Sequence, residues 1–186
     1  IDDHLLPFRK DMCYFMSKPS IRKRPIITPD RRDPDNLYQL TTRFYGTVLF
    51  DQDKFRMWYS ADFLDGPWQP GQEHFPVKSG PIFYAESNDG IDWTKPNLGQ
   101  VEIKGNNDNN ALALPDPQSL TPTLIKDEDD PDPQRRYKMV YSTWNATIRG
   151  SLELPTMRTA LSPDGIHWTA GPEKPVDSFL EHCSFY

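Results

Sequence analysis

Apolar and polar residues alternate along two short segments of the chain. In residues 55–60, Phe, Met and Tyr alternate with Arg, Trp and Ser, and in residues 137–142, Tyr, Met and Tyr alternate with Lys, Val and Ser. A period of two places alternate side chains on opposite faces of an extended chain. Residues 82–85 and 157–160 are further strand candidates, and no segment shows helical periodicity of useful length. The pattern therefore predicts short β-strands separated by loops.

The predicted strands belong to an internal repeat. Three elements recur in the same order after roughly 75 to 82 residues, and such self-similarity is typical of repeat architectures. The offsets differ because loop lengths differ, and loop length varies at small thermodynamic cost. The matching pairs are 47–51 with 123–127, 55–60 with 137–142, and 87–93 with 162–168.

The third pair of elements has a specific turn chemistry. Residues 87–93 and 162–168 both read Ser-x-Asp-Gly-x-x-Trp. The Asp carboxylate can accept backbone N–H groups across a tight turn, and Gly can adopt a positive φ without a Cβ clash. The Trp then re-enters the sheet and packs between layers. Because a catalytic residue has no reason to recur in every repeat, we assign Asp89 and Asp164 to the scaffold.

Four antiparallel strands per repeat, at a repeat length of about 75 residues, describe the blades of a β-propeller with long loops. The sequence therefore predicts an all-β fold of about two four-stranded blades, with an open sheet edge. The expected units are an N-terminal extension packing on the propeller (1–40), blade one (41–104), a connecting loop with blade two (105–175), and the first strand of a third blade (176–186).

Composition and charge narrow the function. Aromatic residues make up 12% of the chain, beside 19 prolines and 10 glycines, which supports short strands and many loops. The formal net charge of −6 disfavours nucleic acid as a partner, because phosphate binding needs a positive face. No apolar stretch approaches membrane-spanning length, so we expect no membrane partner.

Metal sites have little support in the sequence. Cys13 and Cys183 are far apart and form no CxxC motif, which argues against structural zinc and leaves a disulfide open. The acidic segment 127–132 carries oxygen ligands but lacks the glycine and the spacing of a calcium loop. A solvated hairpin turn is the favoured interpretation. We therefore expect no cofactor, with a structural calcium ion as the alternative.

The motifs together carry a family resemblance. The strand and turn motifs, with residues 95–99 (KPNLG), Asn109-Asn110 and residues 136–139 (RYKM), resemble bacterial proteins related to glycoside hydrolase families 32, 43 and 68. Those families are levanase-, invertase- and arabinanase-like five-bladed propellers. The resemblance covers nearly the whole chain. It implies a propeller that acts on or binds poly- or oligosaccharide in an axial funnel, in an extracellular or periplasmic location, with further blades of the same propeller as partners.

The resemblance also implies which residues carry the chemistry. Members place carboxylates at the funnel ends of the innermost strands, and glycoside cleavage needs one carboxylic acid and one opposing carboxylate. Glu181, close to Cys183, is the candidate general acid, and Asp116 is the candidate transition-state stabiliser. Blade one lacks the Asn-Asp-Pro signature of invertase-like enzymes. The predicted substrate-binding residues are Arg43, Tyr45, Trp144 and His182.

Each candidate also has a purely structural interpretation. Glu181 could simply end a strand, and Asp116 could lie in a Pro-flanked turn. Arg43 could form a surface ion pair, and Trp144 could pack between blades. Three hypotheses stay open for the molecule: a glycoside hydrolase with paired carboxylates, a non-catalytic carbohydrate-binding propeller, and a protein-interaction propeller.

Overall fold

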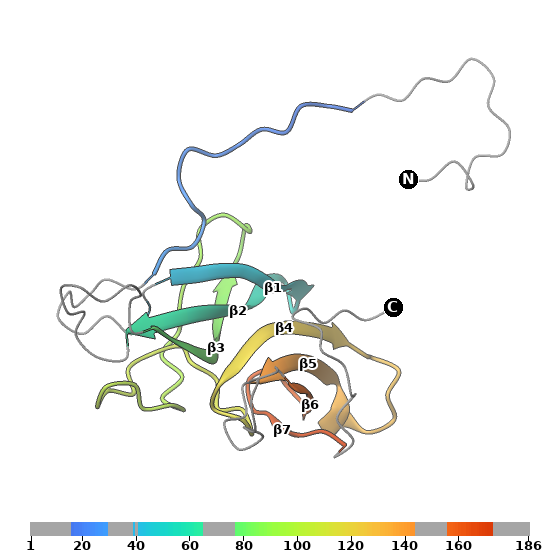
Figure 1. The fold of residues 1–186 in the computed structure, drawn as a ribbon. Helices are drawn as coiled ribbons and strands as arrows, with labels where there is room; N and C mark the ends of the chain where they lie inside the picture. Colours follow the sequence, from blue (N-terminus) through green and yellow to red (C-terminus); the bar gives the residue numbers. More distant parts are fainter. Residues whose placement is uncertain (1–15, 30–38, 40, 65–76, 144–155, 173–186) are drawn as a thin grey trace, which may run out of the picture.

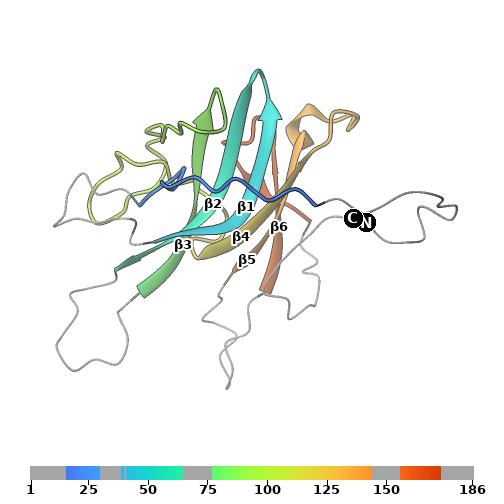
Figure 2. The ribbon, with the colours of Figure 1, turned by 90° about the horizontal axis from the view of Figure 1, so that it is seen from above.

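The computed structural model describes residues 16–29, 39, 41–64, 77–143 and 156–172. These residues form two antiparallel β-sheets, with a one-turn 3-10 helix, η2 (Pro133–Arg135), in a hairpin connection (Figure 1). The expected all-β class is therefore confirmed. The two sheets lie against each other and, in the described part of the chain, do not close into a ring (Figure 2). None of the described helical residues forms a helix long and apolar enough to cross a membrane.

Sheet one contains three strands, in the order β1 (Thr41–Asp51), β2 (Lys54–Leu64) and β3 (Val77–Ser87). Gln52 and Asp53 connect β1 to β2, with φ values of 53° and 60°. A two-residue hairpin turn with positive φ at both positions matches the right-handed twist of the flanking strands. β2 and β3 extend well beyond the short segments predicted from periodicity, because their backbone pairing continues past the alternating residues.

The outer edge of β3 is only partly paired. Residues 110–112 lie beside the middle of this strand and make two backbone hydrogen bonds of 2.9 Å to it. Further along, Thr94 and Glu86 exchange backbone hydrogen bonds of 2.8 and 3.0 Å. The fourth strand expected after the first Ser-x-Asp-Gly turn is thus reduced to an isolated bridge at Thr94.

Sheet two contains four strands, in the order β4 (Ser119–Lys126), β5 (Tyr137–Thr143), β6 (Thr156–Ser162) and β7 (Thr169–Ala170). The second Ser-x-Asp-Gly turn leads into β7, so the predicted fourth strand is present here. Met139 lies opposite Ala160 in the same way as Met57 lies opposite Ala85. The repeat therefore extends to the register of individual side chains.

The two sheets are stacked so that their equivalent faces point in the same direction. We call the face of sheet one that carries Arg56 and Trp58 its forward face, and the opposite face, with Met57 and Tyr59, its rear face. The repeat assigns Lys138 and Val140 to the forward face of sheet two and Met139 and Tyr141 to its rear face. The main hydrophobic cluster joins the forward face of sheet one to the rear face of sheet two. Each sheet thus uses a different face at this interface.

Large aromatic side chains fill the interface between the sheets. Trp58 and Tyr141 are 0% exposed and Tyr137 is 1% exposed. Burying a large apolar side chain contributes about 1.5 to 3 kcal/mol, so these three make the interface a major part of the core. The rear face of sheet one is covered separately by residues of the connecting segments, namely Ile27, Trp93, Val101, Ile103 and Ala111.

Candidate functional site

β1 and β4 each contain an irregularity near their start. The pairing register shifts between Arg43 and Gly46 in β1 and between Leu120 and Thr123 in β4. Thr121, inside the second irregularity, has a φ of 48°, which is unusual for a β-branched residue. Bulges bend a strand and redirect side chains, and they are frequent next to functional sites. The ends at which β1 and β4 begin are therefore the candidate site.

Arg43 forms a two-point ion pair at the start of β1. Its Nε and Nη2 atoms donate to the two carboxylate oxygens of Asp62, each at 2.9 Å, and Thr41 Oγ1 donates to the same carboxylate at 2.9 Å. The Arg43 side chain is 38% exposed and that of Asp62 is 7% exposed. The pair is electrically neutral and offers a partly exposed guanidinium in a fixed orientation.

Asp116 accepts a hydrogen bond just before β4 begins. Tyr141 Oη donates to Asp116 Oδ2 at 2.7 Å. Burial, and then the hydrogen bond to Asp116, raises the pKa of Tyr141. The register equates Tyr59 of sheet one with Tyr141 and Arg43 with Leu120, and Gln39 and Asp116 each precede that second pair by four residues. Gln39 Nε2 indeed lies 3.3 Å from Tyr59 Oη, so the same tie between a polar residue and a tyrosine recurs in both repeats.

Hydrogen bonds connect the two sheets at this level. The backbone N of Thr121 donates to Ser60 Oγ at 2.8 Å, and Thr121 Oγ1 donates to Ser142 Oγ at 3.1 Å. The strained backbone of Thr121 is thus held from both sheets. We call the surrounding set of polar residues the strand-entry cluster; it consists of Thr41, Arg43, Tyr45, Asp62, Asp116 and Tyr141.

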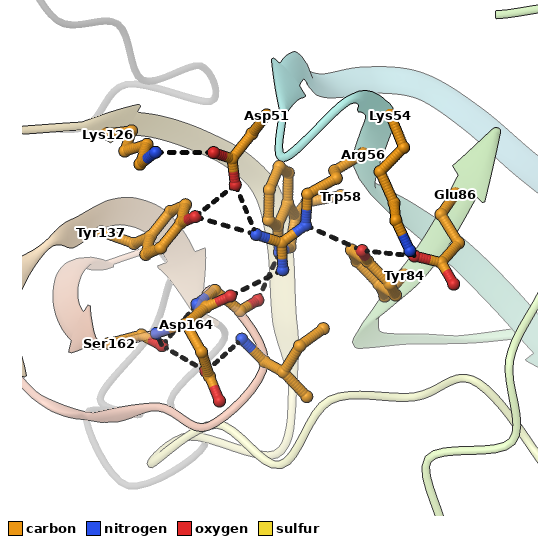
Figure 3. A network of polar contacts seen from close by, with 12 residues as sticks. Asp51, Lys54, Arg56, Trp58, Tyr84, Glu86, Lys126, Tyr137, Ser162 and Asp164 are labelled. Atoms are coloured by element: carbon orange, nitrogen blue, oxygen red, sulfur yellow. Dashed lines mark hydrogen bonds and ion pairs between the residues drawn. The ribbon is translucent and has the colours of Figure 1, made fainter. Parts of the chain in front are cut away.

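A second polar network lies inside the interface between the sheets (Figure 3). Arg56, only 5% exposed, donates to Tyr84 Oη at 2.8 Å, to Asp51 Oδ2 at 2.8 Å and to Tyr137 Oη at 2.9 Å. Its Nη2 atom also donates to the backbone O of Asp164 at 2.6 Å. The guanidinium lies 5.2 to 5.4 Å from the ring centroids of three aromatic residues, Trp58, Tyr84 and Tyr137.

Electrostatics in this network favour the charged forms. Burial raises the pKa of Asp51, but hydrogen bonds from Lys126, Tyr137 and Arg56 outweigh burial and lower that pKa to about 2. Burial and the hydrogen bond to Asp51 raise the pKa of Tyr137 to about 12. Asp51 therefore stays ionised and Tyr137 stays neutral over the physiological range. With its groups paired and enclosed, this network serves packing rather than ligand binding.

The two Ser-x-Asp-Gly turns have nearly identical hydrogen bonds. Asp89 Oδ1 and Asp164 Oδ1 each accept two backbone N–H bonds of 2.8 Å from the residues that follow. Ser Oγ accepts from the backbone N of Gly at 2.9 Å in the first turn and 2.8 Å in the second. These contacts are those of the turn chemistry predicted from the sequence, and they occupy both carboxylates structurally.

Three of the six predicted site residues lie in the described part of the chain. Arg43 and Tyr45 lie near the start of β1, and Asp116 lies three residues before the start of β4. Tyr45 is 38% exposed. Arg43 does form the ion pair that was the structural alternative. Glu181, His182 and Trp144 lie outside the described residues.

Sequence reasoning missed Asp62 and the role of Arg56. Asp62 follows the recognised strand 55–60 by two residues and continues its alternation, which is the signal that could have found it. Arg56 lies on the face of the same strand that the alternation marks as polar, and a side chain on that face is expected to be exposed. Its burial depends on sheet two, and no local pattern contains that information.

The acidic segment 127–132 is occupied by basic side chains. Lys138 Nζ contacts carboxylates of Asp127 and of Asp130, the latter at 2.7 Å, and Arg135 Nε lies 3.4 Å from Asp130. Among the described residues, no group of three His, Cys, Asp or Glu side chains could hold a metal ion. The calcium alternative therefore gains no support from this segment.

Comparison with known proteins gives distant relatives. The chain matches no protein-family model. It is 32% identical over 154 residues to the uncharacterized protein MT1551 of Mycobacterium tuberculosis, over 82% of this chain and 40% of that protein. It is 32% identical over 91 residues to the uncharacterized protein Rv1502 of the same species, over 49% of this chain and 26% of that protein. The chain thus spans two fifths or less of the length of these curated relatives.

Among solved structures, the chain is similar to a glycosyl hydrolase from Bacteroides ovatus. The identity is 19% and the TM-score is 0.42, and the match covers 69% of this chain and 30% of that chain.

Proposed function

We propose that the two sheets are consecutive blades of a glycoside-hydrolase-like β-propeller, and that the strand-entry cluster binds carbohydrate. The stacking of the sheets in one sense and the recurrence of turns, bulges and register support the blade assignment. The position of the cluster, where both innermost strands begin, supports the binding assignment, because loops and strand ends on a rigid scaffold are the usual place for ligands. Five blades and an extracellular or periplasmic location remain part of the proposal.

The Arg43–Asp62 pair is the observation that carries the binding proposal. Its charges cancel, while the exposed part of the guanidinium still offers N–H donors. A neutral, rigid set of donors suits the hydroxyl groups of a neutral sugar better than the carboxylate of an acidic sugar. The partly exposed ring of Tyr45 adds an apolar face of the kind that packs against sugar rings.

Calorimetric titration with a panel of neutral and uronic-acid oligosaccharides tests this proposal. We expect neutral oligosaccharides to bind, and Arg43→Gln to weaken that binding about tenfold, as the loss of a hydrogen bond to a charged group predicts. Lys54→Gln is the matched control, because Lys54 is equally exposed (38%) and paired with Glu86 at the other end of β2. If no member of the panel binds, or if both variants bind as the parent does, the binding proposal is wrong.

Hydrolysis is a further step that depends on Glu181 as general acid. An assay of glycan hydrolysis with the parent chain and the Glu181→Gln variant tests it. We expect any hydrolysis to be lost in the variant, while binding persists. Hydrolysis that is equal in both chains would remove Glu181 from this role.

A non-catalytic carbohydrate-binding propeller is the second candidate. The observation that favours it is the engagement of Asp116 by Tyr141, in the place where the other repeat has Gln39 and Tyr59. Because Gln39, an amide, contacts the equivalent tyrosine in the other repeat, Asp116 serves to hold Tyr141 in place rather than to act on a substrate. Binding without hydrolysis, in the parent chain on the same panel, is the outcome that supports this candidate.

A further inference from the structure

The rear faces of the two sheets differ at the position opposite their equivalent tyrosines. In sheet one, Phe83 lies opposite Tyr59, is 0% exposed, and stacks on the tyrosine with ring centroids 5.8 Å apart. In sheet two, the residue opposite Tyr141 is Arg158. An arginine here gives up the apolar contact and brings a charge to a largely buried face, which is costly unless the charge has a partner. Packing alone therefore does not explain the arginine.

The guanidinium of Arg158 has no partner in the described part of the chain. The residue is half-buried, and it makes no hydrogen bond or ion pair with any described residue. Its charge nevertheless acts on Tyr141: burial and the hydrogen bond to Asp116 raise the pKa of this tyrosine, and Arg158 works in the opposite direction. Directly opposite Cβ atoms of antiparallel strands lie about 5 Å apart, so Arg158 stands beside the tyrosine. Its N–H donors are available to another group.

Asp116 supplies an acceptor at the same tyrosine. Its Oδ2 atom accepts from Tyr141 Oη at 2.7 Å, whereas Oδ1 accepts no hydrogen bond from the described residues. Asp116 and Arg158 both act on the pKa of Tyr141, but they form no ion pair with each other in the described structure. A donor group and an acceptor atom of opposite charge are thus held near one phenol without being joined.

The chemistry of these two groups selects a hydroxyl as their ligand. A hydroxyl group both accepts and donates a hydrogen bond, so it satisfies the guanidinium and the carboxylate oxygen together. A ligand anion would be repelled by the Asp116 carboxylate, and a ligand cation would be repelled by Arg158. A neutral group that is donor and acceptor at once meets neither penalty.

We propose that Arg158 and Asp116 form a second binding point of the strand-entry cluster, at which one hydroxyl group of a neutral sugar accepts from Arg158 and donates to Asp116 Oδ1. The inference rests on the proposed carbohydrate binding, and it adds a specificity-determining residue in sheet two to the Arg43–Asp62 pair in sheet one. The contact is one of binding and not of catalysis, and Oδ2 of Asp116 continues to hold Tyr141.

Calorimetric titration of the full chain with neutral gluco-, manno-, xylo- and arabino-oligosaccharides, and with uronic-acid oligosaccharides, tests this assignment. Arg158→Phe gives sheet two the side chain that sheet one has at this position. We expect this variant to unfold at the same or a higher urea concentration than the parent. It should bind neutral oligosaccharide about tenfold more weakly, because a hydrogen bond to a charged group is lost.

Arg136→Gln is the matched control. Arg136 is also half-buried, and its Nε atom is buried without a hydrogen-bond partner in the described structure, but the residue lies directly before β5, at the opposite end of that strand from Tyr141. This variant should bind neutral oligosaccharide as the parent does.

A second measurement identifies the group that Arg158 contacts. Mono-deoxy analogues of the neutral oligosaccharide that binds most tightly are titrated against the parent and against Arg158→Gln. One analogue should bind the parent about tenfold more weakly than the intact sugar does. That difference should disappear in the variant, because the missing hydroxyl and the missing guanidinium belong to the same contact.

The possible failures are distinguishable. If Arg43→Gln weakens the binding of neutral oligosaccharide while Arg158→Phe and Arg158→Gln bind as the parent does, carbohydrate binding stands and the role of Arg158 is wrong. If uronic-acid oligosaccharides bind the parent more tightly than neutral ones and lose that advantage in Arg158→Gln, an anionic group occupies this point instead of a hydroxyl. If no oligosaccharide binds the parent, both proposals fail.

Discussion

At the scale of single residues, Arg56 links two segments that lie 108 residues apart in the sequence. Its donors reach Asp51 in its own sheet and the backbone of Asp164 in the other. A planar guanidinium serves such diverging acceptors at once, whereas an ammonium is a point charge on a flexible stem. A substitution that no longer reaches every acceptor leaves a buried polar group uncompensated. Fold stability therefore depends on the guanidinium of Arg56 and not only on its positive charge.

Arg56→Lys should therefore lower the free energy of unfolding by about 3 kcal/mol, even though it keeps the positive charge. Urea denaturation of the parent and the variant measures the change. Lys54→Gln, which breaks an exposed pair in the same strand, should cost less than about 1 kcal/mol. If both variants lose the same unfolding free energy, the buried Arg56 network contributes no more to stability than an exposed ion pair.

Asp51 should make the protein sensitive to acid. Its pKa is about 2 in the folded chain against an ordinary value of 3.8, so its contribution to stability is present above pH 4 and is lost as the pH falls toward 2. The shift corresponds to about 2 kcal/mol. Unfolding at pH 6 and at pH 2 should show the parent's advantage over Asp51→Asn shrinking by that amount. An advantage that does not change with pH would contradict the lowered pKa.

At the scale of elements, the two Ser-x-Asp-Gly turns are alike internally and differ in their surroundings. Gly90 has a φ of 73° and Gly165 a φ of 77°. The atoms nearest to a Cβ on Gly90 would belong to the ring of Phe55, at an ordinary 3.6 Å. A Cβ atom on Gly165 would clash with Trp58. The same sequence motif is thus a turn outside the interface in the first repeat, whereas in the second repeat it contacts the other sheet.

Alanine substitution should separate these two roles. Gly90→Ala should cost about 1 kcal/mol, the penalty for positive φ in a residue with a Cβ. Gly165→Ala should cost about 3 kcal/mol, because overpacking against Trp58 adds to the same backbone penalty. Thermal and urea unfolding of both variants measure the difference. Matching losses would mean that the turn backbone alone determines the effect.

At the scale of the whole molecule, the interface makes the sheets depend on each other. The main cluster contains side chains from both sheets, and Arg56 and Trp58 bind the second turn directly. Without sheet one, sheet two loses its described hydrophobic cluster, and without sheet two, sheet one keeps only the cluster on its rear face. The molecule should therefore open as one unit rather than sheet by sheet.

Hydrogen exchange should confirm this shared stability. Amides in the centres of β2 and β5 should have the same opening free energy, because both strands line the common interface. Gly165→Ala should lower both values together, although the substitution lies in sheet two. Loss of protection in β5 alone would show that sheet one is stable by itself.

The sequence by itself determined the local features of this protein. The alternation in residues 55–60 and 137–142 predicted strands, and the Ser-x-Asp-Gly segments predicted turns that the structure forms with the expected hydrogen bonds, because both depend on contacts between near neighbours in the chain. Arg43, Tyr45 and Asp116 were also identified as candidates. Tertiary structure alone decided that Arg56 is buried, that Asp62 pairs with Arg43, and that Asp116 repeats the role of Gln39. Those outcomes depend on which faces of distant strands meet, and the short-range pattern of a sequence does not contain that choice.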